Sequence, residues 1–182
     1  MSTDSQSDLQ GELAALVPNL RAFARSLSGS SDHADDLVQE TLVKAWHNRS
    51  RFAPGSNLKA WLFTILRNTY LSERRKRKWE VQDVDGVGAS QLSVNGSQHG
   101  HMDMVDFQKA FALLPHDQKE ALVLIGAEGF SYEEAALMCG CAVGTMKSRV
   151  NRARARLAQA LGYDDAAGEG EVAGAPTSTG SR

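Results

Sequence analysis

The stretch from Leu114 to Leu161 reads LPHDQKEALVLIGAEGFSYEEAALMCGCAVGTMKSRVNRARARLAQAL and carries the clearest structural signals in the chain. Its pattern predicts three helices separated by two tight turns. The apolar residues at positions 122, 123 and 125 fit a first helix, which Gly126 and Gly129 break. The C-terminal half is therefore expected to be entirely helical.

The second of these helices has signals at both ends. Ser131 is a good N-cap, and Glu134, three residues later, can accept a hydrogen bond from the backbone N–H of the cap. Residues 135–138 are apolar and continue the helix, and Gly140 ends it. The turn that follows is only a few residues long, so the third helix is expected to begin near Val143–Thr145.

The third helix combines an apolar face with a basic one. Its apolar residues are spaced three or four apart and share one side: Val143, Met146, Val150, Ala153 and Leu157. Its other sides carry Lys147, Ser148, Arg149, Asn151, Arg152, Arg154 and Arg156. A solvated basic helix in an ordinary bundle is the simpler alternative. The order of a capped helix, a glycine turn and a basic helix favours a helix-turn-helix instead.

In a helix-turn-helix, the apolar face anchors the third helix while its exposed face enters the major groove of DNA. Lys147, Ser148 and Asn151 lie near the start of the helix and can face base edges together. Arg149 and Arg152, with the two arginines that follow them, are placed to meet phosphates. The pattern therefore predicts recognition of double-stranded DNA.

The string GFSYEEAALMCGCAVGTMKSRVNRARARL, and above all GTMKSRVNRARARL, resembles region 4 of bacterial extracytoplasmic-function (ECF) sigma factors. The resemblance implies that this region reads the −35 promoter element. It assigns that element to Thr145, Lys147, Ser148, Arg149, Asn151 and Arg152. It also implies two partners, promoter DNA and core RNA polymerase, the latter bound through its β′ clamp helices and β flap.

The N-terminal half starts with a polar segment, residues 1–8, which is predicted to be disordered. A helical pattern follows from Leu9, with apolar residues at Leu13, Leu16, Val17, Leu20, Phe23, Ala24 and Leu27. Pro18 interrupts this pattern, so the helix is expected to start or kink there. Gly29–Ser31 is a break, and Asp32 is a candidate cap for the next helix.

The next helix contains the string DDLVQETLVKAW, in which Asp36, Gln39 and Glu40 share an outward side. A solvated acidic face is the simplest explanation of these three residues. The string, however, resembles sigma region 2.2, which docks on the β′ clamp helices. The resemblance assigns polymerase binding to Asp36, Gln39, Glu40 and Trp46, and polar groups around an aromatic anchor suit a protein interface.

Residues 51–58 form a predicted loop with Pro54 and Gly55, and an apolar helix follows and ends in the basic run SERRKRK. The string FAPGSNLKAWLFTILRNTY resembles sigma regions 2.3 and 2.4, in which a flipped base of the −10 element is captured. Asn68 is the best-matched polar group, although a local hydrogen bond is an equal alternative. The other −10 candidates are Phe52, Ser56, Asn57, Arg67, Arg74, Arg75, Arg77 and Lys78.

The chain has 182 residues and a formal net charge of −2, so it has no overall excess of basic residues. Its basic residues are instead concentrated in patches, which is enough for binding to nucleic acid. The cysteines, Cys139 and Cys141, have no second Cys/His pair nearby and are interpreted as packing residues. His99 and His101 also lack a ligand set, so neither a metal nor a cofactor is expected. With no signal peptide and no membrane-spanning run, the predicted location is the cytoplasm, without a membrane partner.

These patterns predict an all-α fold of two small helical domains joined by a flexible linker. The expected boundaries are 1–8 for the disordered N-terminus, 9–80 for sigma region 2, 81–101 for the linker, 102–162 for sigma region 4 and 163–182 for a disordered tail.

Together the quoted strings are most similar to those of EcfG-type sigma factors of the general stress response. The resemblance implies a −35 element of GGAAC type and a −10 element of GTT type. It also implies inhibition by a small NepR-type anti-sigma factor, which a phosphorylated PhyR-type mimic removes. The expected function is a sigma factor that directs promoter-specific initiation and catalyses no reaction.

Three other functions are alternatives to a sigma factor. A sigma-like module could titrate an anti-sigma factor without transcribing, but proteins of that kind carry a receiver domain, for which the residues after Leu161 leave no room. A dimeric repressor would not explain the acidic side of residues 36–40 or the loop at 51–58. An enzyme would need a nucleophile with its base, a phosphate-binding loop or a metal site, and the sequence offers none of these.

Overall fold

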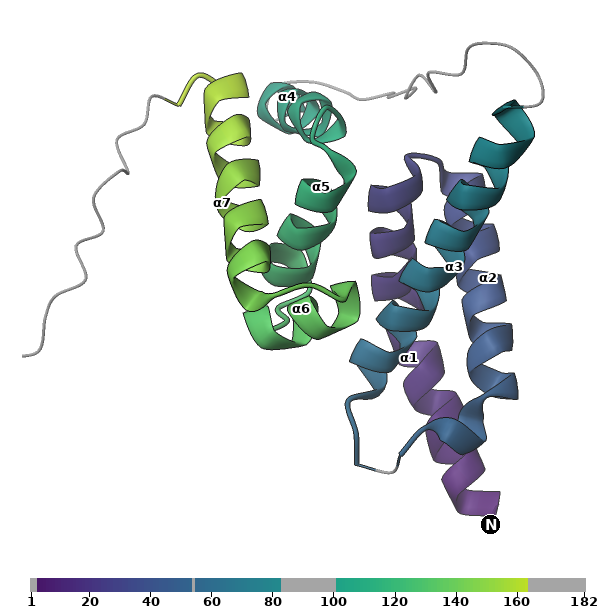
Figure 1. Cartoon of the computed structure of the whole chain (residues 1–182). Coiled ribbons are helices and arrows are strands. Elements are labelled where there is room, and N and C mark those ends of the chain that lie inside the picture. The colour runs from purple at the N-terminus through teal and green to yellow at the C-terminus, as the bar shows by residue number, and fades with distance from the viewer. Residues whose placement is uncertain (1–2, 54, 83–100, 164–182) are drawn as a thin grey trace, which may run out of the picture.

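The computed structural model describes residues 3–53, 55–82 and 101–163, and every regular element in these ranges is a helix. The elements are α1 Thr3–Ser28, α2 Ser31–His47, the short 3-10 helix η1 Arg49–Arg51, α3 Leu58–Gln82, α4 His101–Ala112, α5 His116–Leu122, the π-helical turn η2 Val123–Ala127, α6 Tyr132–Cys139 and α7 Val143–Ala160. Helices α1 to α3 form one group and α4 to α7 a second (Figure 1). The predicted all-α, two-domain fold is confirmed.

The first domain is a three-helix bundle in which α1, α2 and α3 pack on one another. Its centre is formed by side chains from all three helices that are fully or almost fully buried: Leu20, Phe23, Leu37, Leu62, Phe63 and Leu66. The rings of Phe23 and Phe63 stack with centroids 4.9 Å apart. The helical spacing of the apolar residues thus explains the bundle, because each helix buries one stripe and leaves its polar sides in water.

Three local expectations for this domain differ from the structure. Helix α1 already begins at Thr3, inside the segment 1–8 that was predicted to be disordered. It also passes through Pro18, so of the two alternatives at this residue, a start or a kink, the start is excluded. Ser30, rather than Asp32, caps α2, since its hydroxyl accepts a hydrogen bond from the backbone N–H of His33 at 3.4 Å. Asp32 lies in the first turn instead, where a negative charge interacts favourably with the helix dipole.

The second domain is built around the helix-turn-helix. Helix α5 packs on α7, α6 on α7, and α4 against the later turns of α7. The buried stripe of α7 consists of Met146, Val150, Ala153 and Leu157, as its spacing predicts. The first helix of the motif ends later than expected. The π-helical turn η2 follows α5 and includes Gly126, and the chain reverses only at Gly129, which has φ +73°.

The turn between α6 and α7 is fixed by caps at both ends of α6. The hydroxyl of Ser131 accepts a hydrogen bond from the backbone N–H of Glu134, and the carboxylate of Glu134 accepts one from the backbone N–H of Ser131. Gly140 closes the helix in the left-handed region at φ 63°, a conformation in which a Cβ would be strained. The predicted capping box and glycine stop are both present.

Replacing Ser131 by alanine is expected to lower the free energy of unfolding by about 1 kcal/mol, because a backbone N–H loses its partner at the start of α6. Chemical denaturation of the purified chain measures this change. The matched control is Gln159→Ala on the exposed side of α7, which should leave the free energy of unfolding nearly unchanged. Equal losses in the two variants would mean that the cap does not stabilise the fold.

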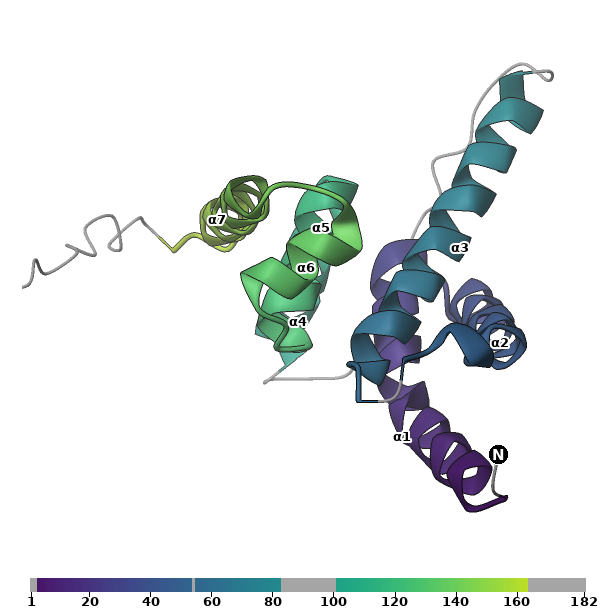
Figure 2. The same cartoon turned by 60° about the horizontal axis from the view of Figure 1, so that its bottom comes forward.

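The linker predicted at 81–101 and the tail predicted at 163–182 lie almost entirely outside the described residues. Helix α3 extends to Gln82, and α4 begins at His101. Viewed from two directions, the C-terminal turns of α3 extend beyond α1 and α2 (Figures 1 and 2).

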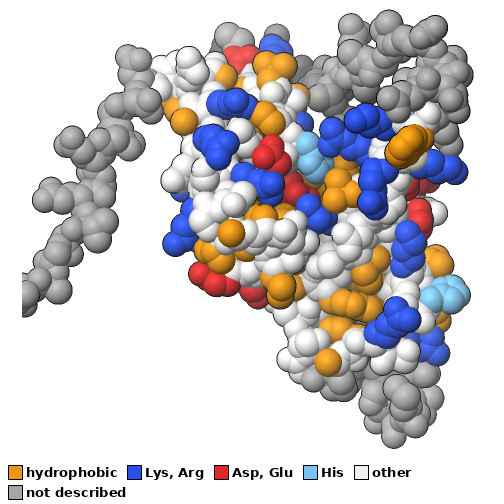
Figure 3. All heavy atoms as spheres, in the orientation of Figure 1, with side chains coloured by type: hydrophobic (Ala, Val, Ile, Leu, Met, Phe, Trp, Pro, Cys, Tyr) orange, Lys and Arg blue, Asp and Glu red, His pale blue; other side chains and the backbone are white. Residues whose placement is uncertain are grey.

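The two domains also contact each other. The rings of Phe63 in α3 and Phe130 before α6 meet edge to face with centroids 5.3 Å apart. The rings of Tyr70 in α3 and His116 in α5 are parallel within 6° and 5.3 Å apart. We call this contact the seam; acidic, basic and histidine side chains gather along it (Figure 3).

Candidate nucleic-acid and polymerase interfaces

The exposed side of α7 presents the residues predicted to read base edges. Thr145, Lys147 and Asn151 are exposed and Ser148 is half-buried, while the buried stripe fixes the helix on α5 and α6. The ammonium of Lys147 lies 5.7 Å from the ring centroid of Tyr132. Long polar side chains anchored beside a rigid apolar stripe are suited to the major groove.

Two of the four arginines predicted to contact DNA here, Arg149 and Arg152, differ in their surroundings. Arg152 is exposed and donates a hydrogen bond to the hydroxyl of Ser148 at 2.7 Å. Arg149 is half-buried; its Nε lies 3.3 Å from a carboxylate oxygen of Asp117, and its Nη1 lies 3.7 Å from the sulfur of Cys141. Arg149 thus ties α7 to α5 and to the turn, a packing role that spacing alone does not reveal.

The polymerase candidates lie together on α2. Asp36, Gln39 and Glu40 are exposed, and the carboxylate of Glu40 forms an ion pair of 2.6 Å with Lys44. Trp46 is half-buried at the end of the helix, and the guanidinium of Arg49 lies 4.8 Å from its ring centroid. This acidic side thus lies on the surface of the helix, as predicted.

Val43 belongs to the same side of α2 but was missed by the sequence reasoning. It follows Asp36 by seven residues and Glu40 by three, which places it on the same helical face. Its side chain is 55% exposed. An exposed apolar group among acidic ones is a contact that an interface core uses, and the spacing in the sequence already contained this signal.

The loop before α3 is held by its own polar side chains. The backbone N–H and the hydroxyl of Ser56 both donate to the carbonyl of Ala53, at 3.0 and 2.7 Å. Asn57 caps α3, because its side-chain oxygen accepts the backbone N–H of Ala60 at 3.0 Å. Phe52 is half-buried, with its ring centroid 5.2 Å from that of Trp61.

Asn57 also crosses the seam, since its amide donates a hydrogen bond to the carboxylate of Glu134 at 2.9 Å. Arg67 does the same: its Nε–H lies 2.7 Å from the carboxylate of Glu120. Their side chains are 15% and 2% exposed, so this ion pair is shielded from water. Burial alone would lower the pKa of Arg67, but the attraction and hydrogen bond of Glu120 outweigh it and raise that pKa.

Further along α3, Asn68 is exposed on the helix surface, and Arg74, Arg75, Arg77 and Lys78 are exposed in its last turns. Basic side chains gather over this end of α3 (Figure 3). Arg77 is partly engaged, because its Nη2 lies 3.2 Å from the ring nitrogen of His33. Trp79 follows this run with its side chain 73% exposed; it was missed, although an aromatic next to cations is itself typical of nucleic-acid surfaces.

The cysteines were expected to be packing residues. Cys139 is buried, and burial raises the pKa of its thiol to about 12, so the reactive thiolate is scarce at neutral pH. Within residues 3–53, 55–82 and 101–163, no cluster of His, Cys, Asp and Glu could hold a metal ion.

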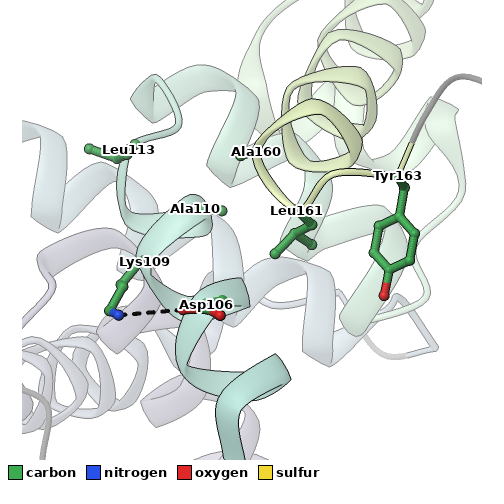
Figure 4. Close-up of a pocket in the computed structure, with 7 residues that line it drawn as sticks. All are labelled: Asp106, Lys109, Ala110, Leu113, Ala160, Leu161 and Tyr163. Atoms are coloured by element: carbon green, nitrogen blue, oxygen red, sulfur yellow. Dashed lines mark hydrogen bonds and ion pairs between the residues drawn. The ribbon is translucent and has the colours of Figure 1, made fainter.

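An open pocket of about 320 Å³ lies between α4 and the end of α7 (Figure 4). Its charged lining residues, Asp106 and Lys109, pair with each other at 3.4 Å, and the rest of its lining is largely apolar. None of the candidate interface residues lines this pocket. The pocket is therefore separate from both candidate DNA-binding surfaces.

The two domains match two parts of one protein family. Sigma-70 region 2 matches residues 13–80, and sigma-70 region 4 matches residues 104–157. The chain belongs to the sigma-70 family. Like other sigma factors, it binds core RNA polymerase and directs promoter-specific initiation of transcription, and its family is not a family of enzymes.

Among curated relatives, this sigma factor is similar to the ECF RNA polymerase sigma factor EcfG of Rhodopseudomonas palustris (strain TIE-1). The two are 57% identical over 164 residues, which cover 90% of this chain and 89% of the relative. It is therefore a sigma factor of the ECF group.

Among solved structures, it resembles the sigma factor RpoE in complex with the anti-sigma factor NepR from Bartonella quintana. The TM-score is 0.79 at 57% identity, with 86% of this chain and 98% of that chain covered. The PhyRSL–NepR complex from Sphingomonas sp. Fr1 shares the fold, with a TM-score of 0.66 at 22% identity and coverage of 94% and 98%. The 57% identity to EcfG and to RpoE favours a sigma factor over a sigma-like module that does not transcribe. No helix within the described residues is long and apolar enough to span a membrane.

Proposed function

We propose that this sigma factor serves the general stress response and is held inactive by a NepR-type anti-sigma factor. The observation that carries this proposal is the 57% identity to EcfG over nearly the whole chain, together with the same identity to a sigma factor solved with NepR. The chain would act in the cytoplasm by binding alone, with no catalytic step.

We further propose which surfaces perform each task. The side of α2 formed by Asp36, Gln39, Glu40 and Val43, with Trp46 at its end, docks on the β′ clamp helices. The exposed side of α7 reads the −35 element, and α4 to α7 contact the β flap. The −10 strand is held by Phe52, Ser56 and Asn57 before α3, by Arg67 and Asn68 within α3, and by the basic end of this helix.

The test is runoff transcription with purified core polymerase on a template with a GGAAC-type −35 and a GTT-type −10 element. A transcript that depends on the sigma factor and disappears on adding a NepR-type protein supports both parts of the proposal. A transcript that persists in a stoichiometric excess of that protein would remove the anti-sigma assignment but leave the sigma factor itself intact.

Replacing Asn68 by alanine is expected to reduce promoter opening about 5- to 150-fold, since an extruded base loses a hydrogen-bonding partner worth roughly 1–3 kcal/mol. Asn68 is exposed, so the fold should be unaffected. Permanganate reactivity of the −10 thymines in the polymerase complex measures opening. The control is Gln159→Ala, an exposed amide near the end of α7 that belongs to neither candidate DNA surface; equal reactivity of all three proteins would exclude Asn68 from base capture.

A further inference from the structure

Two residues assigned to the −10 strand are occupied by the other domain. The amide of Asn57 donates to Glu134 at 2.9 Å, and the Nε–H of Arg67 donates to Glu120 at 2.7 Å. A carboxylate offers Arg67 the charge and the oxygen acceptors that a phosphate would offer. The same two side chains therefore cannot contact DNA and the second domain at the same time.

The two sides of the seam carry complementary charges. Glu128 is 4% exposed and lies 3.0 Å from the ammonium of Lys59, while the amide of Asn19 donates to Glu128 at 3.0 Å. Glu120 is 2% exposed and pairs with Arg67. In the described part of the chain, the cations that pair with these two carboxylates, Lys59 and Arg67, thus both belong to the first domain. A buried carboxylate without its partner is strongly unfavourable, so this pairing favours one specific closed arrangement.

Aromatic contacts surround these ion pairs. The ammonium of Lys59 lies 5.0 Å from the ring centroid of Phe130 and 5.6 Å from that of Phe63. Phe63 precedes Arg67 in α3 and Tyr70 follows it. The contacts of these two rings with Phe130 and His116 add apolar area to the seam. Closing the seam therefore buries apolar surface in addition to pairing charges, and both effects stabilise the closed arrangement.

We propose that the seam is an autoinhibitory contact, in which Glu120 and Glu134 occupy Arg67 and Asn57 in place of promoter DNA. The domains must separate before the −10 strand can bind. This inference rests on the proposed assignment of Asn57 and Arg67 to the −10 site. Apparent affinity for that strand falls in proportion to the open fraction, so a chain that is open one tenth of the time binds about tenfold more weakly.

The chain contains its own reporter of opening. Cys139 is buried at 9% exposure beside the Arg67–Glu120 pair, so separation of α3 from α6 exposes its thiol. Cys141, two residues later, is partly exposed even when the seam is closed. It lies on the turn beside Arg149. The rate at which iodoacetamide modifies Cys139 relative to Cys141, followed by mass spectrometry, therefore measures the open fraction without added labels.

The test variant is Glu128→Lys, which places a second cation beside Lys59 and should open the seam. We expect the relative alkylation rate of Cys139 to rise roughly tenfold. We expect a similar gain in affinity for a single-stranded oligonucleotide carrying the non-template −10 sequence, measured by fluorescence anisotropy. The swap Lys59→Glu with Glu128→Lys restores the pair with its charges exchanged, and should return the alkylation rate most of the way to the original.

The matched control is Glu133→Lys, the same charge change at an exposed residue of α6. It corrects the anisotropy for a general gain of positive charge, and it should leave the alkylation of Cys139 slow. Circular dichroism melting of all variants separates opening of the seam from unfolding of a domain.

Alkylation that stays slow in a folded Glu128→Lys variant overturns the proposal, as does a swap that restores nothing. Faster alkylation without any gain in oligonucleotide affinity over Glu133→Lys would show that the seam opens but does not mask the −10 site, and this also overturns it. Neither result affects the transcription assay above, so failure of the seam and failure of the sigma-factor function are distinguishable.

Discussion

Replacing both Asp36 and Glu40 by lysine is expected to abolish binding to core RNA polymerase while the domain stays folded. Truncating or reversing one partner of a desolvated interface pair costs at least about 2 kcal/mol, so two reversals weaken binding roughly a thousandfold. Both residues are exposed on α2, and Glu40 has only a local ion pair with Lys44 to lose. Fluorescence polarisation with purified core enzyme measures the affinity.

The control for this variant is Glu12→Lys with Glu133→Lys, two exposed acidic residues that lie on other helices. It makes the same change in net charge, so any general electrostatic effect on binding appears in both proteins. Unchanged affinity of the Asp36/Glu40 variant would refute the assignment of α2 to polymerase docking.

Replacing Lys147 and Asn151 by alanine is expected to remove most of the discrimination between a correct and an altered −35 element. Each base contact in a major groove is worth about 1–3 kcal/mol, so the loss is roughly 5- to 150-fold per residue. Both side chains are exposed beside the buried stripe of α7, and the fold does not depend on them. Binding of the polymerase holoenzyme to the two promoter sequences measures the discrimination.

Arg154→Ala is the comparison variant, because Arg154 is exposed on α7 and is assigned to phosphate. It should weaken binding to both sequences alike and reduce the dependence of log affinity on log salt concentration by about 1. If the Lys147/Asn151 variant behaved in this way too, the two residues would be phosphate contacts and base reading would lie elsewhere on α7.

Much of this architecture follows from local patterns in the sequence. The spacing of Met146, Val150 and Leu157 predicts the buried side of α7, and Ser131 with Gly140 predicts both ends of α6. These features depend on residues a few positions apart, so the physical chemistry of one helix determines them. Ser30, rather than Asp32, is the cap of α2, because side chains two positions apart could both serve and only backbone geometry decides between them.

The seam could not be predicted in this way. Arg67 and Glu120 are separated by 53 positions, and nothing in either local sequence indicates the other as its partner. Glu120 lies in a short polar helix and resembles a solvated residue until the packing of α3 buries it. Arg149 was likewise assigned to phosphate by spacing, whereas Asp117 and Cys141 hold it against the domain.

The most direct test of the central claim is runoff transcription from four templates that carry an intact promoter, an altered −35, an altered −10 or both alterations. We predict that core polymerase with this sigma factor gives one start site on the intact template, much less transcript when either element is altered, and none when both are. Transcripts that are the same on all four templates, and the same as with core polymerase alone, would contradict the claim that the two domains hold one promoter at two places.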